Sequence, residues 1–332
     1  MQIVPDIRTA HLSTPAVITV GNFDGVHRGH QTLLRHLSAV AAESDGPQPV
    51  TAIVTFDPHP LAVLRPDVPL KLLTTPHERL QIAAGLGIDI GVILPFTREL
   101  AALEPRAFLA LLKQRLGLSA LVVGPDFALG RGRTGNLDVL AGLAEELDYR
   151  LVVLEPIAWE GKSVRSNVIR QLLTEGEVDE AAALLGRLYH VSGIVQVGDR
   201  LGHQLGIPTA NFLETEHKLR PGNGVYATRT WLQRDGRPHA YQSVTNIGVR
   251  PTVNGALRRL ETHILDFPPS GDSGDLYGQE LTVEFLTRLR GEQKFTGVPE
   301  LVAQIHADID AARRLFASAP SLQQPFFLTP LA

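Results

Sequence analysis

The sequence predicts an α/β domain with a parallel sheet, followed by a smaller β domain with an antiparallel barrel and a closing helix. The chain has 332 residues, which is long for one compact core. Apolar runs of strand length alternate with helical stretches up to about residue 186, and short β-rich runs without intervening helices follow. We therefore expect two domains, residues 1–186 and residues 187–332.

The first domain contains five strand candidates separated by stretches whose apolar residues have helical spacing. Strands are expected at 16–20, 50–56, 88–94, 120–124 and 150–154, and helices at 31–42, 76–85, 106–116 and 136–146. Strands that alternate with helices favour a parallel sheet with crossover helices, and ligands of such sheets bind beyond the carboxyl ends of the strands. The turns at Gly21, Asp57 and Gly124 are expected at that edge.

The second domain has β-rich runs broken by Gly, Pro and Asn, which is typical of short antiparallel strands that close into a barrel. These runs are expected at 189–197, 224–232, 239–247, 258–266 and 280–289. The closing helix places apolar residues at Leu301, Ile305, Ile309 and Leu315 among charged ones. A helix at 178–185 is expected to link the two domains.

Composition limits the classes of function. With 31 basic and 35 acidic residues the formal charge is −4, which gives no electrostatic footprint for nucleic acid or an anionic membrane. The absence of cysteine excludes disulfides and thiol catalysis and fits a reducing cytosol. Neither a signal peptide nor a bilayer-spanning apolar run is evident. We expect a cytoplasmic protein with small-molecule partners, neither nucleic acid nor membrane, and leave self-association open.

The ten residues after the first strand candidate carry the most specific chemical signal in the chain. They read Gly21-Asn22-Phe23-Asp24-Gly25-Val26-His27-Arg28-Gly29-His30 and lie between a strand and a helix. A glycine-bearing turn that opens a helix points backbone N–H groups and the positive end of the helix dipole at an anion. His27 and His30 are expected on one helical face, where they can donate hydrogen bonds to phosphoryl oxygens in a transition state.

Two other interpretations of this pair are possible. One histidine caps the helix while the other lies on its surface, or the two share a zinc ion. Zinc is not favoured, because the chain has no cysteine and no third ligand other than Asp24 is evident nearby. The simple capping role is not favoured either, because the motif is also matched at Gly21, Phe23, Asp24, Gly25 and Gly29.

The motif resembles the HxGH signature of the nucleotidyltransferase superfamily, and its longer GxFDGxHxGH form is similar to that of the flavin adenylyltransferases. The resemblance implies a nucleotidyltransferase-type, Rossmann-like first domain in which His27 and His30 are catalytic. It also implies a set of nucleotide-binding residues in the turn, namely Gly21, Phe23, Asp24, Gly25 and Gly29.

Three further segments of the first domain suit a flavin and a nucleotide. In Thr55-Phe56-Asp57-Pro58-His59-Pro60, two prolines fix a loop whose rings could line a flat aromatic ligand. The run from Val122 to Gly130 ends a strand in a glycine turn and continues into the basic, mobile loop 131–135, which suits phosphate. Ser166-Asn167-Val168-Ile169-Arg170 places a hydroxyl, an amide and a guanidinium group at a helix start.

These segments resemble, in order, the flavin-contacting proline loop, the VGxDFxFG segment and the SSTxIR segment of flavin adenylyltransferases. The resemblance implies flavin contacts from Phe56, Pro58, His59, Pro60, Asp126 and Phe127, and nucleotide contacts from Ser166, Asn167 and Arg170. Leu129 stands where the family often has a second aromatic residue, and Arg165 and Asn167 replace a serine and a threonine. We expect these departures to alter nucleotide affinity before they abolish activity.

In the second domain the informative stretch runs from Gly198 to Phe212. Glycines at 198, 202 and 206 allow a close backbone approach to phosphates. Thr209 and Asn211, two apart in extended chain, present side-chain oxygens on one face, and such hard ligands suit Mg²⁺. The stretch resembles the PTAN motif of riboflavin kinases. The resemblance implies nucleotide binding by Gly198, Gly202, Gly206, Thr209 and Asn211, while His203 stands where the family commonly has arginine.

Three later segments continue the resemblance to the kinases, at 221–227, 245–252 and 261–267. In the kinases the glutamate of the last segment is the general base that acts on the ribityl hydroxyl, which implies this role for Glu261. A glutamate on a barrel strand is otherwise most often a solvent-facing charge. His263 is expected on the same face and is given no role. For Arg288, Arg290 and Lys294, phosphate binding and a solvated face remain equally open.

The resemblance extends over residues 16–312, and the chain is similar to bifunctional prokaryotic riboflavin kinases/FAD synthetases. This implies that riboflavin and ATP give FMN at the barrel, and that FMN and ATP give FAD and pyrophosphate at the first domain, with Mg²⁺ as cofactor. Two alternatives remain. One site is degraded and the enzyme is monofunctional, or the protein is a flavin-binding module without catalysis.

Overall fold

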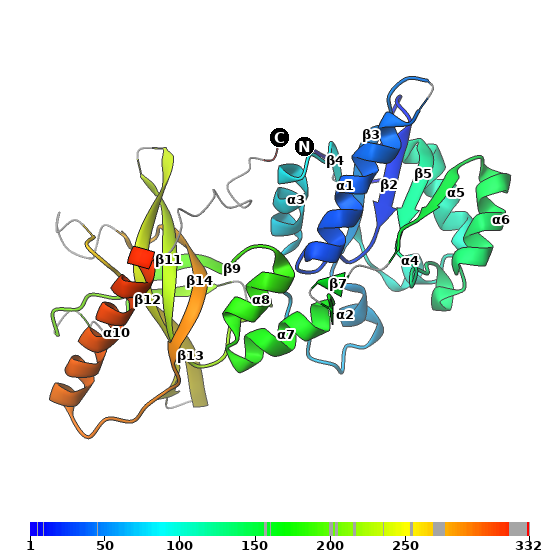
Figure 1. Cartoon of the computed structure of the whole chain (residues 1–332). Coiled ribbons are helices and arrows are strands. Elements are labelled where there is room, and N and C mark those ends of the chain that lie inside the picture. Colours follow the sequence, from blue (N-terminus) through cyan, green and yellow to red (C-terminus); the bar gives the residue numbers. More distant parts are fainter. Residues whose placement is uncertain are drawn as a thin grey trace. The chain divides into compact units, whose positions relative to one another are not determined.

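The computed structural model describes residues 1–318 and 331, apart from 5, 9, 45, 156–157, 160, 199–201, 203–204, 215–216, 235, 253–254 and 268–275 (Figure 1). Two compact units are present. The first contains residues 1–166 together with Leu331, and the second contains residues 167–318. Among the described helices, none combines the length and the apolar character that a bilayer-spanning segment needs.

The first unit is built on a six-stranded sheet in which every pair of neighbours is parallel. In spatial order the strands are β1 (Gln2–Val4), β4 (Ile90–Pro95), β3 (Val50–Asp57), β2 (Ala16–Val20), β5 (Leu118–Val123) and β6 (Arg150–Val153). From β2 the chain first adds strands on one side and then crosses to the other side at β5. The carboxyl ends of β2 and β5 therefore form the crevice where ligands of doubly wound sheets bind.

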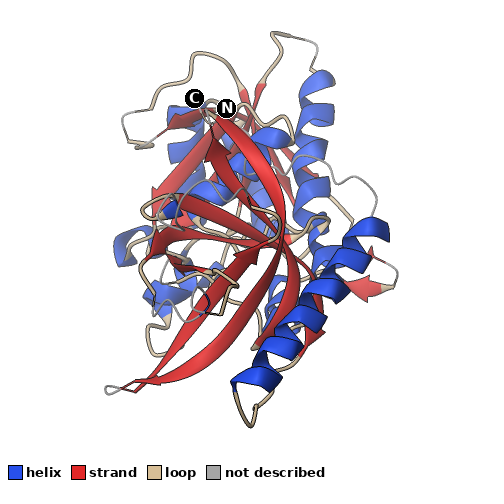
Figure 2. Cartoon of the chain, turned by 90° about the vertical axis from the view of Figure 1, so that its left-hand side faces the viewer, coloured by secondary structure: helices blue, strands red, loops and turns tan. Residues whose placement is uncertain are grey.

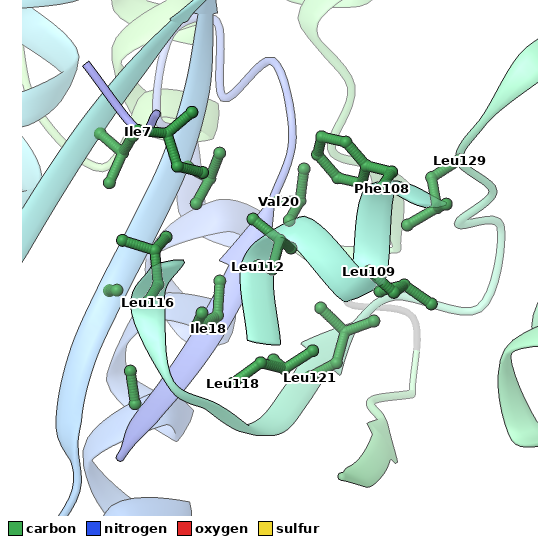
Figure 3. Close-up of a cluster of buried hydrophobic side chains, with 14 of the residues drawn as sticks. Ile7, Ile18, Val20, Phe108, Leu109, Leu112, Leu116, Leu118, Leu121 and Leu129 are labelled. Carbon is green, nitrogen blue, oxygen red and sulfur yellow. The ribbon is translucent and has the colours of Figure 1, made fainter. Parts of the chain in front are cut away.

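Helices cover both faces of this sheet. They are α1 (Arg28–Ala42), α2 (Pro60–Leu64), α3 (Pro76–Gly85), α4 (Arg98–Ala101), α5 (Pro105–Leu116) and α6 (Leu137–Leu147), with a 3-10 turn at Arg131–Arg133. One buried cluster joins α5 to the central strands, with Leu109 and Leu112 against Ile18 and Leu121 (Figure 3). A second cluster joins Leu34 and Leu37 of α1 to Ile53 and to α3. A two-stranded hairpin, β7 (Ala158–Trp159) and β8 (Lys162–Ser163), follows β6.

Local sequence explains where these helices begin and end. Thr75 caps α3 in a capping box with Glu78, and Pro76 occupies its first turn. Pro105 opens α5, and Gly117 ends it in the left-handed conformation.

A buried ion pair fixes the turn between β2 and α1. The Asp24 carboxylate accepts hydrogen bonds from the backbone N–H groups of Leu73 and Thr74, each at 3.0 Å, and from the Thr74 hydroxyl at 3.1 Å. Arg79 of α3, 1% exposed, lies 3.8 Å from Asp24 and donates to the Thr55 hydroxyl and to the Phe56 carbonyl. One charged pair thus ties together the ends of β2 and β3 and the start of α3.

The second unit begins with α7 (Ser166–Glu175) and α8 (Val178–Leu185), followed by a closed antiparallel barrel (Figures 1 and 2). Around the barrel the strands are β10 (Ala210–Glu214), β13 (Gly255–Ile264), β12 (Arg237–Thr252), β11 (Gly224–Arg234), β14 (Glu280–Arg290) and β9 (Tyr189–Gln196). Arg288 of β14 donates to the carbonyls of Glu175 and Asn223, which attaches the end of α7 to the barrel. The domain boundary expected after residue 186 stays a prediction.

Hydroxyl groups pair with one another among the buried residues of the barrel strands. The Thr228 hydroxyl lies 2.9 Å from that of Ser243 and 2.7 Å from that of Thr245, and Thr245 lies 3.0 Å from Thr262. Ser243 also meets Thr230 at 2.8 Å. All five side chains are fully buried, so this hydroxyl network replaces part of the apolar packing inside the unit.

Helix α10 (Val298–Ser318) closes the chain and packs against β11, β12 and β14. Figure 2 shows this long helix alongside the barrel strands. Ile309, Ala312 and Phe316 pack with the barrel strands, whereas Leu315, expected on the same face, is 39% exposed. Positions 309, 312 and 316 lie on one face of the helix, whereas position 315 lies beside that face.

The predicted fold class is confirmed, because a parallel α/β sheet precedes a closed antiparallel barrel and a final helix. Each expected strand is present, with shifts of a few residues at the ends. Strands β1, β7, β8 and β10 and helices α2 and α4 were not expected as elements, although an extended chain was expected at Thr209 and Asn211. β10 reads Ala-Asn-Phe-Leu-Glu, without a β-branched residue, and is held by pairing with β9 and β13 rather than by local preference.

We predict that Arg79→Met destabilises the first unit by about 3–5 kcal/mol, because it leaves the Asp24 carboxylate buried without its counter-charge. The chain has two tryptophans, and Trp159, whose ring lies 3.6 Å from the Arg28 guanidinium carbon, reports on the first unit. Urea unfolding followed by Trp159 fluorescence in a Trp231→Phe background measures the change.

Arg106→Met is the matched control, because the pair between Arg106 and Glu146 is exposed on both sides. Its expected cost is below about 1 kcal/mol. Equal costs for the two variants would contradict a supporting role for the buried pair.

Candidate functional site

A cavity of about 730 Å³ opens in the first unit at the carboxyl ends of β2, β3 and β5. Its volume lies in the range of ordinary small-molecule sites. Nine of the predicted site residues line it, namely Gly21, Phe23, His27, Gly29, His30, Phe56, Pro60, Asp126 and Phe127. The structure therefore gathers the turn motif, the proline loop and the segment after β5 at one place, as the topology predicts.

Both histidines of the motif belong to the wall of this cavity. His27 caps α1, and its Nδ1 accepts a hydrogen bond from the backbone N–H of His30 at 3.4 Å. Because Nδ1 accepts, a neutral His27 carries its proton on Nε2. The two rings stack with centroids 3.6 Å apart and planes 15° apart. The capping interpretation thus holds for His27, but His30 faces the cavity and not an open surface.

Asp24 and Gly25 stabilise the conformation of the turn. Asp24 is 2% exposed and binds the loop before α3, and the Gly25 N–H donates to the Thr74 hydroxyl at 2.9 Å. Neither residue is part of the cavity wall. In the part of the chain that the structure describes, no three His, Asp or Glu side chains come together as a metal site.

The proline loop contributes unequally to the wall. The rings of Phe56 and Phe96 meet edge to face at 5.4 Å, and Phe56, Phe96 and Pro60 all line the cavity. His59 caps the short helix α2 instead, accepting from the Leu61 N–H at 3.1 Å. His59 and Pro58 lie outside the lining set, so their predicted flavin contacts remain untested.

The basic loop after β5 is folded back on itself through paired backbone bonds between Leu129 and Gly135. Arg131 forms an ion pair with Glu104 at 2.8 Å, whereas Arg133 donates to the Asp126 carbonyl and lines the cavity. Of the two arginines, Arg133 is thus the one placed to meet an anionic ligand. The expected mobility of this loop is untested.

Two of the residues that depart from the family pattern lie at the ligand space of the first unit. Leu129 and Arg165 line the cavity. The Ser166 hydroxyl donates to the Asp24 carbonyl at 2.9 Å, which joins the start of α7 to the motif turn. Asn167 and Arg170 follow on α7 in the second unit, and their nucleotide contacts stay a prediction. His203 lies outside the described residues.

A second cavity, of about 280 Å³, lies in the second unit between the barrel strands and α10. Strand register builds its polar wall. Asn211 of β10 and Asn246 of β12 both pair directly with Glu261 of β13, so the three side chains form a row on one face. All three residues line the cavity, together with Thr209 and His263. Glu261 is therefore not a solvent-facing charge on an outer surface.

Asn211 presents a buried acceptor atom in this cavity that suits a bound ligand. Its Oδ1 is buried, and among the described residues it has no hydrogen-bond partner. A buried acceptor without a donor costs about 1–3 kcal/mol, so a bound group that satisfies it is expected. Amide and hydroxyl oxygens suit Mg²⁺, which takes further ligands from phosphates and water. The donors at Thr209 and Asn211 therefore fit the predicted metal site.

Gly198 leaves room for this asparagine. A Cβ atom at position 198 would lie 2.4 Å from Nδ2 and 2.7 Å from Cγ of Asn211. Gly202 similarly approaches the Ile207 carbonyl and the Thr209 side chain. Gly206 has a φ of +73° with open space around it, so its role is in the turn.

The opposite wall of the second cavity contains an arginine whose guanidinium group is held in place by an ion pair. Arg290 lines the cavity and binds both carboxylate oxygens of Asp308 on α10, with Nη2 at 2.9 Å. Gln304 donates to the same carboxylate at 2.9 Å. Arg288 is engaged by backbone carbonyls, and Lys294 is exposed, so only Lys294 matches the solvated-face interpretation.

Two residues of this site were missed as functional candidates. Asn246 lies within a matched segment but enters the site only through its pairing with Glu261. Asp308 becomes relevant because β14 and α10 bring it to Arg290. A register built from the alternating pattern of β12 and β13 would have indicated Asn246, whereas no local signal indicates Asp308.

Comparison with known proteins assigns the two units to two enzyme families. The FAD synthetase family model matches residues 9–168, and the riboflavin kinase family model matches residues 185–316. Bifunctional riboflavin kinase/FMN adenylyltransferases are similar over almost the whole chain. That of Escherichia coli K12 is 36% identical over 90% of this chain and 92% of its own length. That of Pseudomonas fluorescens is 37% identical over 92% and 94%.

The similarity extends to a solved structure. The crystal structure described as a macrolide-efflux protein from Streptococcus pneumoniae superposes with a TM-score of 0.83 at 28% identity. It covers 94% of this chain and 99% of its own length.

We predict that Gly198→Ala slows FMN formation from riboflavin by about a hundredfold, because the added methyl group displaces Asn211 from the ligand space. FAD formation from supplied FMN should not change. Chromatographic separation of riboflavin, FMN and FAD over time measures both reactions.

Gly297→Ala is the matched control, because its Cβ would meet Pro299 at an ordinary 3.6 Å. If Gly198→Ala is as active as this control, the close approach to Asn211 has no part in the kinase site.

Proposed function

The chain belongs to the family of bifunctional riboflavin kinases/FMN adenylyltransferases, and from that premise we propose how its two cavities divide the two reactions. The protein phosphorylates riboflavin with ATP to FMN, and it adenylylates FMN with ATP to FAD and pyrophosphate. We assign the first reaction to the cavity of the barrel unit and the second to the cavity of the sheet unit. The observation that carries the assignment is the row Asn211, Glu261 and Asn246, which lines only the smaller cavity.

In the kinase reaction, the Glu261 carboxylate takes the proton from the 5′-hydroxyl of riboflavin. The oxygen forms a bond to the γ-phosphorus of ATP while the bond between that phosphorus and the β,γ-bridging oxygen breaks, which releases ADP. Thr209 and Asn211 would hold Mg²⁺ with the ATP phosphates. A cation held by these two residues would supply positive charge next to the phosphates during the transfer. Arg290 on the facing wall is held by Asp308, so its guanidinium group is fixed in orientation and its charge is balanced by the carboxylate.

In the adenylyltransfer reaction, an oxygen of the FMN phosphate attacks the α-phosphorus of ATP, and the bond to the departing pyrophosphate breaks. His27 donates from Nε2, since its Nδ1 is engaged by the His30 N–H. His30 and the N-terminus of α1 add to the stabilisation of the negative charge that develops. Phe56, Pro60 and Phe127 supply the apolar wall for the flavin ring.

We extend the proposal to the partners of the protein, to its location and to two further residues of the nucleotide site. Small-molecule substrates are the partners, without nucleic acid or membrane, and the location is the cytoplasm. The contributions of Asn167 and Arg170 to the nucleotide site are likewise proposed from their place in the motif.

We predict that His30→Ala reduces FAD formation from supplied FMN by about 10²–10³-fold, because a donor to the developing charge is lost. FMN formation from riboflavin should continue at the rate of the unmodified protein. His36→Ala is the control, since His36 is exposed on the same helix and should leave both rates unchanged.

We predict the reverse pattern for Glu261→Gln. FMN formation should fall by about 10²–10⁴-fold, because the amide cannot accept the proton of the ribityl hydroxyl. FAD formation from supplied FMN should persist. Glu280→Gln, an exposed position at the start of β14, is the control. Loss of both reactions in either the His30 or the Glu261 variant would refute the division into two sites.

A further inference from the structure

His263 forms a hydrogen bond next to the proposed metal site of the kinase. It follows Glu261 by two residues on β13, lies on the same face and lines the smaller cavity. Its Nδ1 is 2.7 Å from the carbonyl oxygen of Pro208. A carbonyl oxygen only accepts, so Nδ1 carries the hydrogen and donates it.

The acceptor of this bond lies directly before the metal-binding segment. Strand β10 begins at Ala210, where its register pairs Ala210 with Thr262 and Asn211 with Glu261. Pro208 precedes the strand, and as a proline it offers no N–H to a neighbouring strand. The carbonyl of Pro208 lies in the same rigid peptide plane as the nitrogen and Cα of Thr209. Holding that oxygen fixes the nitrogen and Cα of Thr209, and the pairing of Ala210 with Thr262 holds the peptide that follows, so together they restrict the direction in which the Thr209 side chain leaves the backbone.

We propose that His263 is a positioning residue for the kinase reaction, which holds the peptide between Pro208 and Thr209 so that the Thr209 hydroxyl and the Asn211 amide oxygen meet the same MgATP. The inference rests on the proposed metal site at Thr209 and Asn211. In this role β13 holds the segment in two ways. Its backbone pairs with β10, and its His263 side chain binds the carbonyl of Pro208, which lies before the start of that strand.

The surroundings of the ring suit this role. Burial lowers the pKa of His263 below its ordinary value, with smaller contributions from Arg313 and His306 in the same direction. The bond to Pro208 and the charge of Asp266 act in the opposite direction. A neutral ring beside the cavity adds no positive charge that would repel a cation.

A different role for the same residue is chemically distinct. His263 could transfer a proton or contact a substrate through Nε2, in which case Nδ1 would only orient the ring. Asparagine and glutamine separate the two roles, because the asparagine amide nitrogen reproduces Nδ1 and the glutamine amide nitrogen reproduces Nε2.

The experiment compares His263→Asn, His263→Gln and His263→Ala in the full-length protein. FMN formation is measured as MgATP is varied and as Mg²⁺ is varied at fixed ATP. The Kd of MgADP is measured by calorimetry without turnover, and it should rise in His263→Ala and His263→Gln. For His263→Ala and His263→Gln we expect the KM for MgATP and the Mg²⁺ concentration at half-maximal rate to rise by about tenfold or more. His263→Asn should remain within about threefold of the unmodified protein, and the KM for riboflavin should not move in parallel.

Several outcomes would overturn the proposal. They are rescue by glutamine and not by asparagine, equal losses in the two amide variants, and an unchanged Mg²⁺ requirement in all three variants. Trp231, which donates to Glu284 in the folded unit, reports whether each variant is folded. If His263→Ala does not fold, the comparison between asparagine and glutamine still decides.

Thr209→Ala separates a failure of this inference from a failure of the proposed metal site. If Thr209→Ala does not change the Mg²⁺ requirement, the metal site itself is wrong. If Thr209→Ala raises it while the His263 variants do not, the metal site stands and only the positioning role falls.

Discussion

The site in the first unit depends on the Asp24 carboxylate, which lies outside the wall of the cavity. Asp24 and Arg79 are 2% and 1% exposed, and burying both charges is costly unless hydrogen bonds satisfy the remaining atoms. The backbone of the loop before α3 satisfies Asp24, and the end of β3 satisfies Arg79. Within the turn, Phe23 and Val26 adopt φ values of 48° and 37°. Such backbone persists only where the surroundings hold it, and the buried pair provides that support.

The second site depends on a different constraint, the register of antiparallel strands. Its polar side chains come from β10, β12 and β13, and they share a face only because Glu261 pairs with an asparagine on either side. The cavity in the first unit is assembled from turns that follow strands, whereas this one is assembled from residues inside strands. Each unit thus places its candidate site where its own topology brings residues from distant parts of the sequence together.

The sequence was sufficient to predict the fold class and the grouping of many candidate residues around the two cavities. Alternation of strands and helices predicted the parallel sheet, and the motif turn after β2 lies at the edge where the topology places ligands. The interior role of Asp24 was not predictable, because its partners at 73, 74 and 79 are about fifty residues away. The capping role of His59 was not predictable, because helix α2, which begins directly after it, was not expected. Asn246 and Asp308 likewise acquire meaning only through strand pairing and helix packing.

The buried hydroxyl network has a consequence for how the barrel forms. A strand that slips by one residue exposes its core side and is rejected by burial alone, but a slip of two residues restores the alternation of faces. Between β12 and β13, a slip that places Thr262 opposite Ile247 would separate its buried hydroxyl from that of Thr245. Each unsatisfied group costs about 1–3 kcal/mol, whereas a purely apolar interior would tolerate the shift. The pair of Thr245 and Thr262 therefore disfavours a shift in this direction, which would retain a hydrophobic core yet carry Glu261 away from Asn246.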